Sequence, residues 1–330
     1  MLATACRTPP RPPHPPAPEL IRRSQPLLGT FVVISAVAPA GAERARVNDA
    51  ISAAFAEIRR IDALMSLHRA DSELQRVNAS AAADPVAVSP DLFRVLTAAV
   101  AIAAATDGGL DITVEPLTQL WGFIWKEYRL PTDAELAAVL PRVDYRHLEL
   151  TPATQTVRFK RPGVRLDLGG IAKGYAVDCA VEKLRALGIA NAMVRAGGDL
   201  RAIGHPPDGD AWTVQLEDPA KTGRRVTIQL RDAAISTSGN YENYFEIAGH
   251  RYSHIINPRT GLPVAGLAAC SVIAPTCLES DGLATGLFVL GPERSLARLG
   301  QRYGMRFVLP RQGGGFTEQV SPRFPPVQRE

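Results

Sequence analysis

Residues 165–175 read Arg-Leu-Asp-Leu-Gly-Gly-Ile-Ala-Lys-Gly-Tyr. This pattern predicts a short strand over 164–168, a glycine turn, and a helix over 171–187. Glycine lets a backbone approach a ligand closely, and the first N–H groups of a helix attract an anion. The stretch is not a Walker A loop, because Tyr175 stands where a lysine is required. Nor is it a G-x-G-x-x-G motif, because Ala172 replaces the second glycine. It predicts either an anion-binding turn or an ordinary tight turn.

Helices and short strands surround this stretch without regular alternation. Apolar residues recur at three- and four-residue steps over 43–65, which predicts an amphipathic helix. A Ser-Pro pair at 89–90 begins a second helix, and further helices are expected over 281–290 and 292–304. Strand-like segments lie at 27–37, 156–160, 193–195, 212–216, 226–230, 269–273 and 306–309. The irregular order favours an α+β fold over a doubly wound parallel sheet.

The composition indicates an ordinary globular protein. The chain has 330 residues, of which 46% are hydrophobic and 21% are charged. These values suit one large domain or two closely packed ones, and they exclude a disordered chain, a collagen and a coiled coil. The longest weakly polar run, 96–105, is far shorter than the roughly 18–20 residues of a transmembrane helix. The net charge of +4 comes mostly from arginines within residues 1–30, so nucleic acid is not an expected partner.

The four cysteines predict neither disulfides nor zinc. Cys6, Cys179, Cys270 and Cys277 form no C-x-x-C pair, and a chain of this length does not need a disulfide framework. Cys270 and Cys277 could approach each other, but we expect reduced packing residues.

Both ends of the chain are expected to lie outside the fold. Prolines crowd residues 7–18, so we expect 1–25 to be a disordered tail and 26–310 to be one folded unit. Residues 311–330, rich in Gly, Pro and Gln, are expected to form a flexible tail. The first residues lack the apolar segment of a secretory signal. We therefore expect a cytoplasmic protein, or one at the periplasmic face of the inner membrane if the start site is misassigned.

Three further segments combine glycine with polar residues. In 106–116, Asp111 lies in an apolar neighbourhood, so its carboxylate needs partners from the backbone or from a ligand. The segments 235–241 and 254–261 carry hydroxyls and glycines that can face phosphate oxygens. His254, within them, is either a catalytic group or an ordinary packed or surface histidine.

The segment 279–286 carries a carboxylate and a hydroxyl at helical spacing. Asp281 and Thr285 are four residues apart, so on a helix they share one face. With no His or Cys nearby, these hard oxygen donors suit Mg²⁺ rather than zinc. The alternative is an Asp that caps the helix N-terminus and an unrelated interior Thr.

Taken in order, these segments resemble the FAD:protein FMN transferase family, also called ApbE. The matching stretches are Gly29-Thr30, 65–78, 107–123, 167–175, Gly197-Gly198-Asp199, 237–241, 254–263 and 281–285. The resemblance implies a single compact α+β unit with T-fold-like mixed sheets and packed helices. It also implies a Mg²⁺-dependent transferase that moves FMN from FAD to a Thr or Ser hydroxyl of a target flavoprotein and releases AMP.

The resemblance assigns roles to individual residues. Asp281 and Thr285 match side-chain ligands of Mg²⁺, and Gly170 matches a position that supplies a main-chain carbonyl to the metal. His254 matches the proposed general base, a task that a neutral imidazole suits. The positions that line the FAD are matched by Met65, Gly109, Leu110, Asp111, Asp167, Lys173 and Ile256.

Two other functions remain open at this point. The same residues would serve a Mg²⁺-dependent FAD pyrophosphatase, in which water replaces the acceptor hydroxyl and FMN and AMP are released. A non-catalytic FAD-binding protein is the third reading, and it is disfavoured by the presence of both the metal pair and His254.

Overall fold

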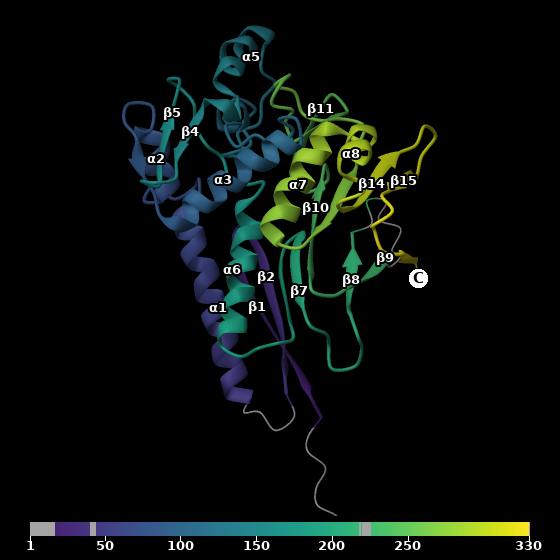
Figure 1. The fold of residues 1–330 in the computed structure, drawn as a ribbon. Helices are drawn as coiled ribbons and strands as arrows, with labels where there is room; N and C mark the ends of the chain where they lie inside the picture. The colour runs from purple at the N-terminus through teal and green to yellow at the C-terminus, as the bar shows by residue number, and fades with distance from the viewer. Residues whose placement is uncertain (1–16, 40–43, 218, 220–225, 330) are drawn as a thin grey trace, which may run out of the picture.

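The computed structural model describes residues 17–39, 44–217, 219 and 226–329. Its centre is an eight-stranded sheet in the order β1-β2-β6-β7-β10-β13-β14-β15, and each of its ladders is antiparallel (Figure 1). These strands are β1 (Glu19–Leu27), β2 (Thr30–Ala38), β6 (Ala192–Ala196), β7 (Asp199–Ile203), β10 (Ala233–Gly239), β13 (Ala269–Ala274), β14 (Gly304–Pro310) and β15 (Phe316–Val320). The prediction of an α+β fold is confirmed.

Smaller elements surround this sheet. The short strands are β3 (Val86–Ala87), β4 (Leu148–Thr151), β5 (Thr156–Phe159), β8 (Trp212–Leu216), β9 (Val226–Leu230), β11 (Tyr244–Ile247), β12 (His250–Ser253) and β16 (Gln328–Arg329). The helices are α1 (Arg44–Met65), α2 (Glu73–Ser80), α3 (Pro90–Ala105), α4 (Glu115–Leu120), α5 (Asp133–Val139), α6 (Ala172–Ala186), α7 (Cys277–Leu290) and α8 (Pro292–Leu299). Among the described residues, no helix has the length and apolarity that a bilayer crossing requires.

Helices α1, α6 and α7 cover one face of the large sheet (Figure 1). The apolar stripe predicted for α1 is buried along its whole length, from Val47 through Phe55 to Met65. Burial of such a stripe against a sheet is the main force that holds an amphipathic helix in place. In a second hydrophobic cluster, Trp212 and Ile228 of the three-stranded sheet β16-β9-β8 pack with Leu200 of the eight-stranded sheet.

The N-terminal boundary predicted at residue 26 is wrong, because the fold includes β1 from Glu19 onward. β1 and β2 form a hairpin whose two turn residues, Leu28 and Gly29, both have positive φ (56° and 69°). This is the turn geometry that matches the twist of two antiparallel strands. The sequence hid β1 because it is an edge strand with mostly exposed polar side chains. The rest of the predicted tail, 1–16, lies outside the described residues.

The prediction of a flexible tail over 311–330 is also wrong. β15 pairs with β14, and β16 pairs with β9. Glu318 on β15 holds Arg306 at 2.9 Å and Arg329 at 2.8 Å. Phe324, between the two strands, is buried in the cluster of Trp212. Polar strands at a sheet edge resemble a loop in composition, which explains the error.

The predicted strand over 164–168 is extended but belongs to no sheet. Its backbone groups bond elsewhere: Leu166 exchanges two hydrogen bonds with the Asn78 side chain, and the Asp167 N–H donates to the Ile112 carbonyl at 2.8 Å. The strand pattern therefore marks a buried extended segment that leads into α6.

The helix predicted over 281–290 begins earlier, at Cys277, with Thr276 as its N-cap. Asp281 is therefore an interior helix residue and not a cap. Cys179, Cys270 and Cys277 are free thiols, as expected, and Cys6 lies outside the described residues.

We predict that Gly174→Ala destabilises the protein. An added Cβ would lie 2.7 Å from the Asp281 Cβ and closer still to the Cys277 carbonyl, so α6 and α7 would have to separate. Overpacking of this kind costs about 1–3 kcal/mol of unfolding free energy, measurable by denaturant titration. The matched control is Gly209→Ala, where the nearest atom would be 3.8 Å away and the change should stay within about 0.5 kcal/mol. Equal stability of the two variants would contradict the packing described here.

Candidate active site

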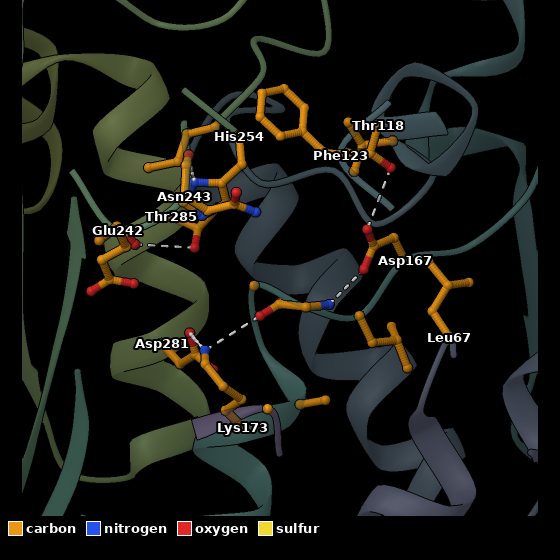
Figure 2. Close-up of a pocket in the computed structure, with 18 of the residues that line it drawn as sticks. Leu67, Thr118, Phe123, Asp167, Lys173, Glu242, Asn243, His254, Asp281 and Thr285 are labelled. Atoms are coloured by element: carbon orange, nitrogen blue, oxygen red, sulfur yellow. Dashed lines mark hydrogen bonds and ion pairs between the residues drawn. The ribbon is translucent and has the colours of Figure 1, made fainter. Parts of the chain in front are cut away.

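One cavity of about 560 Å³ lies between α6, α7, the loop after α3 and the hairpin β11-β12. This volume is typical of small-molecule sites. Figure 2 shows Asp281 and Thr285 on one side of the cavity and Asp167 and Thr118 on the opposite side. The predicted site residues all line it: Met65, Gly109, Leu110, Asp111, Asp167, Gly170, Lys173, His254, Ile256, Asp281 and Thr285. Segments as far apart in sequence as Met65 and Thr285 thus meet in one place.

The turn before α6 brings the backbone of two helices into contact. Gly174, in the first turn of α6, donates its N–H to Asp281 Oδ2 of α7 at 2.9 Å. Asp281 is buried, and the N-terminus of α6 has no side-chain cap of its own. The Asp281 carboxylate therefore takes the place of a cap, and the positive end of the helix dipole stabilises its charge.

Lys173 sits at the centre of the charged part of the cavity. Its Nζ is 2.8 Å from Asp199 Oδ2 and 3.8 Å from Asp281 Oδ1. Burial alone would lower the pKa of Lys173, but the charges of Asp199 and Asp281 outweigh it and raise that pKa above its usual range. For Asp281, burial and then the charge of Asp199 raise the pKa, and Lys173 offsets part of this rise.

The charges of the cavity fit a divalent cation. Asp199, Glu242 and Asp281 line the cavity together with Lys173, and burial raises the pKa of Glu242 and of Asp281. A hard divalent cation would stabilise the charged forms of these carboxylates. Within the described part of the chain there is no cluster of three His, Cys, Asp or Glu side chains that could hold a metal. A site here would therefore need hydroxyl or main-chain oxygens as well.

Thr285 and Gly170 are neighbours that carry a hydroxyl oxygen and a main-chain carbonyl oxygen. Thr285 lies one turn after Asp281 on α7, and its Oγ1 is 3.3 Å from Ser238 Oγ of β10. A Cβ added to Gly170 would lie 3.0 Å from Thr285 Oγ1, so the backbone at Gly170 packs tightly against the Thr285 side chain. Asp281, Thr285 and Gly170 could together hold Mg²⁺, because all three offer hard oxygen donors.

His254 directly follows β12 and enters the cavity from the side of the hairpin. Its Nδ1 and its backbone N–H both lie 3.0 Å from the Asn243 carbonyl. A carbonyl can only accept, so Nδ1 carries the proton and Nε2 is left as an acceptor. The Phe123 ring packs edge to face against the His254 imidazole, with 6.5 Å between the ring centroids. Burial lowers the pKa of His254, the Asn243 carbonyl raises it in part, and the charge of Lys173 lowers it further.

Two carboxylates predicted to line the FAD are already bonded to the protein. Asp111 Oδ1 accepts from the N–H and Oγ1 of Thr113, and Asp111 Oδ2 accepts from the Tyr145 N–H at 2.8 Å. It shapes the wall of the cavity by holding the loop in place. Asp167 Oδ1 accepts from the Gly169 N–H at 2.8 Å, while its Oδ2 has only a long contact of 3.5 Å to Thr118 Oγ1. Asp167 thus keeps acceptor capacity for a ligand.

Sequence reasoning assigned no role to several residues that line the cavity. Asp199 was noticed only as part of a Gly-Gly-Asp match, yet it is the nearest partner of Lys173. Ser238, Glu242, Asn243 and Phe123 also face the cavity. The two glycines before Asp199, between two strand-like segments, were the one local signal for its position.

The cavity therefore has the size, the charge and the donor set of an enzyme active site. A sequence model of the ApbE family matches residues 28–309. A FAD:protein FMN transferase of Vibrio cholerae is 40% identical over 268 residues, which cover 79% of this chain and 79% of the relative. One of Haemophilus influenzae is 37% identical over 273 residues, which cover 80% and 79%.

Solved structures agree with these sequence matches. The flavin transferase ApbE from Vibrio cholerae superposes with a TM-score of 0.82 at 35% identity, covering 93% of this chain and 98% of that one. The Pseudomonas stutzeri flavinyl transferase ApbE gives 0.81 at 32% identity, covering 93% and 96%. The chain belongs to the ApbE family. The predicted ApbE-like fold is confirmed, and so is the predicted enzyme class, a transferase.

We predict that His254 titrates below its usual pKa of about 6.5 in the folded protein. At a pH between the folded and the unfolded pKa of His254, the unfolded chain binds more protons than the folded protein. The contribution of neutral His254 to the unfolding free energy is therefore fully present above about pH 6.5. It is lost as the pH falls through the folded pKa. The difference in unfolding free energy between wild type and His254→Gln, measured without metal or FAD, should shrink over this window. A difference that grows on acidification would contradict the assignment.

Proposed function

We propose that this protein transfers FMN from FAD to a Thr or Ser hydroxyl of an acceptor flavoprotein, with Mg²⁺, and releases AMP. Flavin transfer itself is supported by family membership and by the names of the relatives. The observation that carries the finer proposal is the single cavity in which hard oxygen donors, an ammonium and a neutral imidazole converge. Attack on a pyrophosphate concentrates negative charge on phosphoryl oxygens, and positive groups stabilise that charge.

The residues divide the work as follows. Asp281, Thr285 and the Gly170 carbonyl would hold Mg²⁺, whose chemistry is to neutralise charge on the phosphoryl oxygens. The Lys173 side chain is 32% exposed and lines the cavity, and its ammonium would bind a phosphate oxygen. His254 would accept the proton of the acceptor hydroxyl on Nε2, which is free because Nδ1 is bonded to Asn243. The hydroxyl oxygen then bonds to the phosphorus of FMN while the bond from that phosphorus to the AMP oxygen breaks.

The apolar and amide groups of the cavity would hold the rest of the FAD. Met65, Leu110 and Ile256 are buried side chains on its wall. Asp167, with its incompletely bonded carboxylate, offers an acceptor for a donor on the ligand. In such a site the apolar wall matches the shape of a large ligand, and a few polar contacts fix the ligand's orientation.

The direct test is mass spectrometry of a candidate acceptor flavoprotein after incubation with this enzyme, FAD and Mg²⁺. We expect an added FMN phosphoester on one Thr or Ser and one AMP per modified acceptor. Free FMN released at the same rate with and without acceptor would favour the pyrophosphatase. FAD retained with no AMP formed would favour the non-catalytic protein. Either result would overturn the proposal.

In the same assay, Asp281→Asn should lower the transfer rate about 100-fold or more at saturating FAD. This is the scale on which a lost electrostatic contact to a transition state reduces rate. The Asn side chain has nearly the size of Asp and retains an acceptor for the Gly174 N–H, so the fold should persist. The control is Asp71→Asn, an exposed carboxylate 2.9 Å from Arg69 that does not line the cavity, which should leave the rate unchanged. A wild-type rate for Asp281→Asn would show that the metal assignment is wrong.

A further inference from the structure

Lys173 has two carboxylates within reach and is closer to the one that is not a proposed metal ligand. Its Nζ is 2.8 Å from Asp199 Oδ2, against 3.8 Å from Asp281 Oδ1. The only other close partner among the described residues is the Gly169 carbonyl at 3.4 Å. The ammonium therefore rests on Asp199, and Asp281 Oδ1 has no tight ion pair.

The two Asp281 oxygens have different partners. Oδ2 accepts the Gly174 N–H at 2.9 Å, a contact fixed by the packing of α6 on α7. Oδ1 accepts no hydrogen bond from the described residues and has the Lys173 ammonium at 3.8 Å, so it keeps more acceptor capacity for a cation than Oδ2 does. A metal and the ammonium would thus compete for the same oxygen, because two cations cannot both sit close to one carboxylate oxygen without strong repulsion.

Asp199 cannot follow the lysine, whereas the lysine can move. Asp199 is the first residue of β7 and lies between β6 and β10, opposite Ala196 and Ser236. Its side chain is 4% exposed, and the preceding Gly197 has a φ of +59° that fixes the turn. Lys173 is a flexible side chain on α6, so its ammonium goes wherever the nearest negative charge holds it.

We propose that Asp199 is a positioning residue that holds the Lys173 ammonium away from Asp281 Oδ1 and so keeps this oxygen free for Mg²⁺. The inference rests on the metal site of the proposed function and adds a residue to it. Without the Asp199 charge, the nearest carboxylate left to Lys173 is Asp281. The lysine would then pair with Oδ1 and compete with the metal.

The test is a double-mutant cycle on Mg²⁺ affinity, measured by calorimetric titration of Mg²⁺ into the full chain without FAD. The four proteins are wild type, Asp199→Asn, Lys173→Met and the double variant. We expect Asp199→Asn to raise the Kd for Mg²⁺ about tenfold in the presence of Lys173, which lies within the range of couplings between contacting residues. In the Lys173→Met background the same substitution should change the Kd by no more than about twofold.

The comparison of Asp199→Asn with and without Lys173 distinguishes a positioning role of Asp199 from a general effect of its charge on the metal. If Asp199 only adds negative potential, its removal raises the Kd by the same factor with and without Lys173, and the proposal is overturned. Glu242→Gln is the matched control: Glu242 also lines the cavity and its charge acts on Lys173, but the described residues give the two no ion pair. The factor by which Glu242→Gln changes the Kd should depend on the presence of Lys173 less than the factor for Asp199→Asn does. If Asp199→Asn does not fold, Asp199→Ser removes the same charge with a smaller side chain.

Failure of the inference and failure of the proposed function give different results. If wild type binds Mg²⁺, Asp281→Asn does not, and Asp199→Asn binds as wild type does, the positioning role alone is wrong. If Asp281→Asn binds Mg²⁺ as tightly as wild type, the metal site itself is wrong and the role of Asp199 falls with it.

Discussion

The contact between α6 and α7 at Gly174 is the constraint on which the site depends. Because Gly174 has no side chain, its backbone reaches α7 and donates an N–H to Asp281. This one hydrogen bond orients the Asp281 carboxylate, compensates part of the cost of burying it and leaves its second oxygen toward the cavity. Thr285 follows one turn later on the same helix face, so the orientation of α7 sets both oxygens at once.

Around this contact, the chain assembles groups of opposite character. Lys173 and the carboxylates of Asp199, Glu242 and Asp281 form the part of the cavity lined by ionisable side chains. His254 enters from the hairpin β11-β12, where stacking of Phe245 on Tyr252 and on Tyr128 gives the support apolar packing. Burial lowers the pKa of His254 and so favours the neutral imidazole, whereas burial raises the pKa of Asp281 and of Glu242, so a cation bound beside these two carboxylates would favour their charged forms.

The sequence predicted what local periodicity can encode. The stripe of α1, the Ser89 cap of α3 and the shared face of Asp281 and Thr285 follow from the 3.6-residue repeat, and the structure has all three. The edge strands β1 and β15 were missed because their exposed polar side chains read as loops.

Within the site, the errors and omissions came from contacts between distant segments. The sequence left open whether the partners of Asp111 come from the backbone or from a ligand, and in the structure they come from Thr113 and the Tyr145 backbone. The pairing of Lys173 with Asp199 joins a helix to a strand and leaves no periodic trace in the chain. Family resemblance supplied the candidate residues, and the fold then brought all of them to one cavity.

We propose that Asp281, Thr285 and Gly170 form one cation site next to the phosphates of FAD. A crystal structure of this protein with FAD and Mn²⁺, in which anomalous scattering locates the metal, would test this site. We expect a metal at roughly 2.0–2.2 Å from an Asp281 oxygen and from Thr285 Oγ1, with a phosphate oxygen as a further ligand. A metal bound elsewhere in the cavity, with Lys173 paired to Asp281, would contradict it.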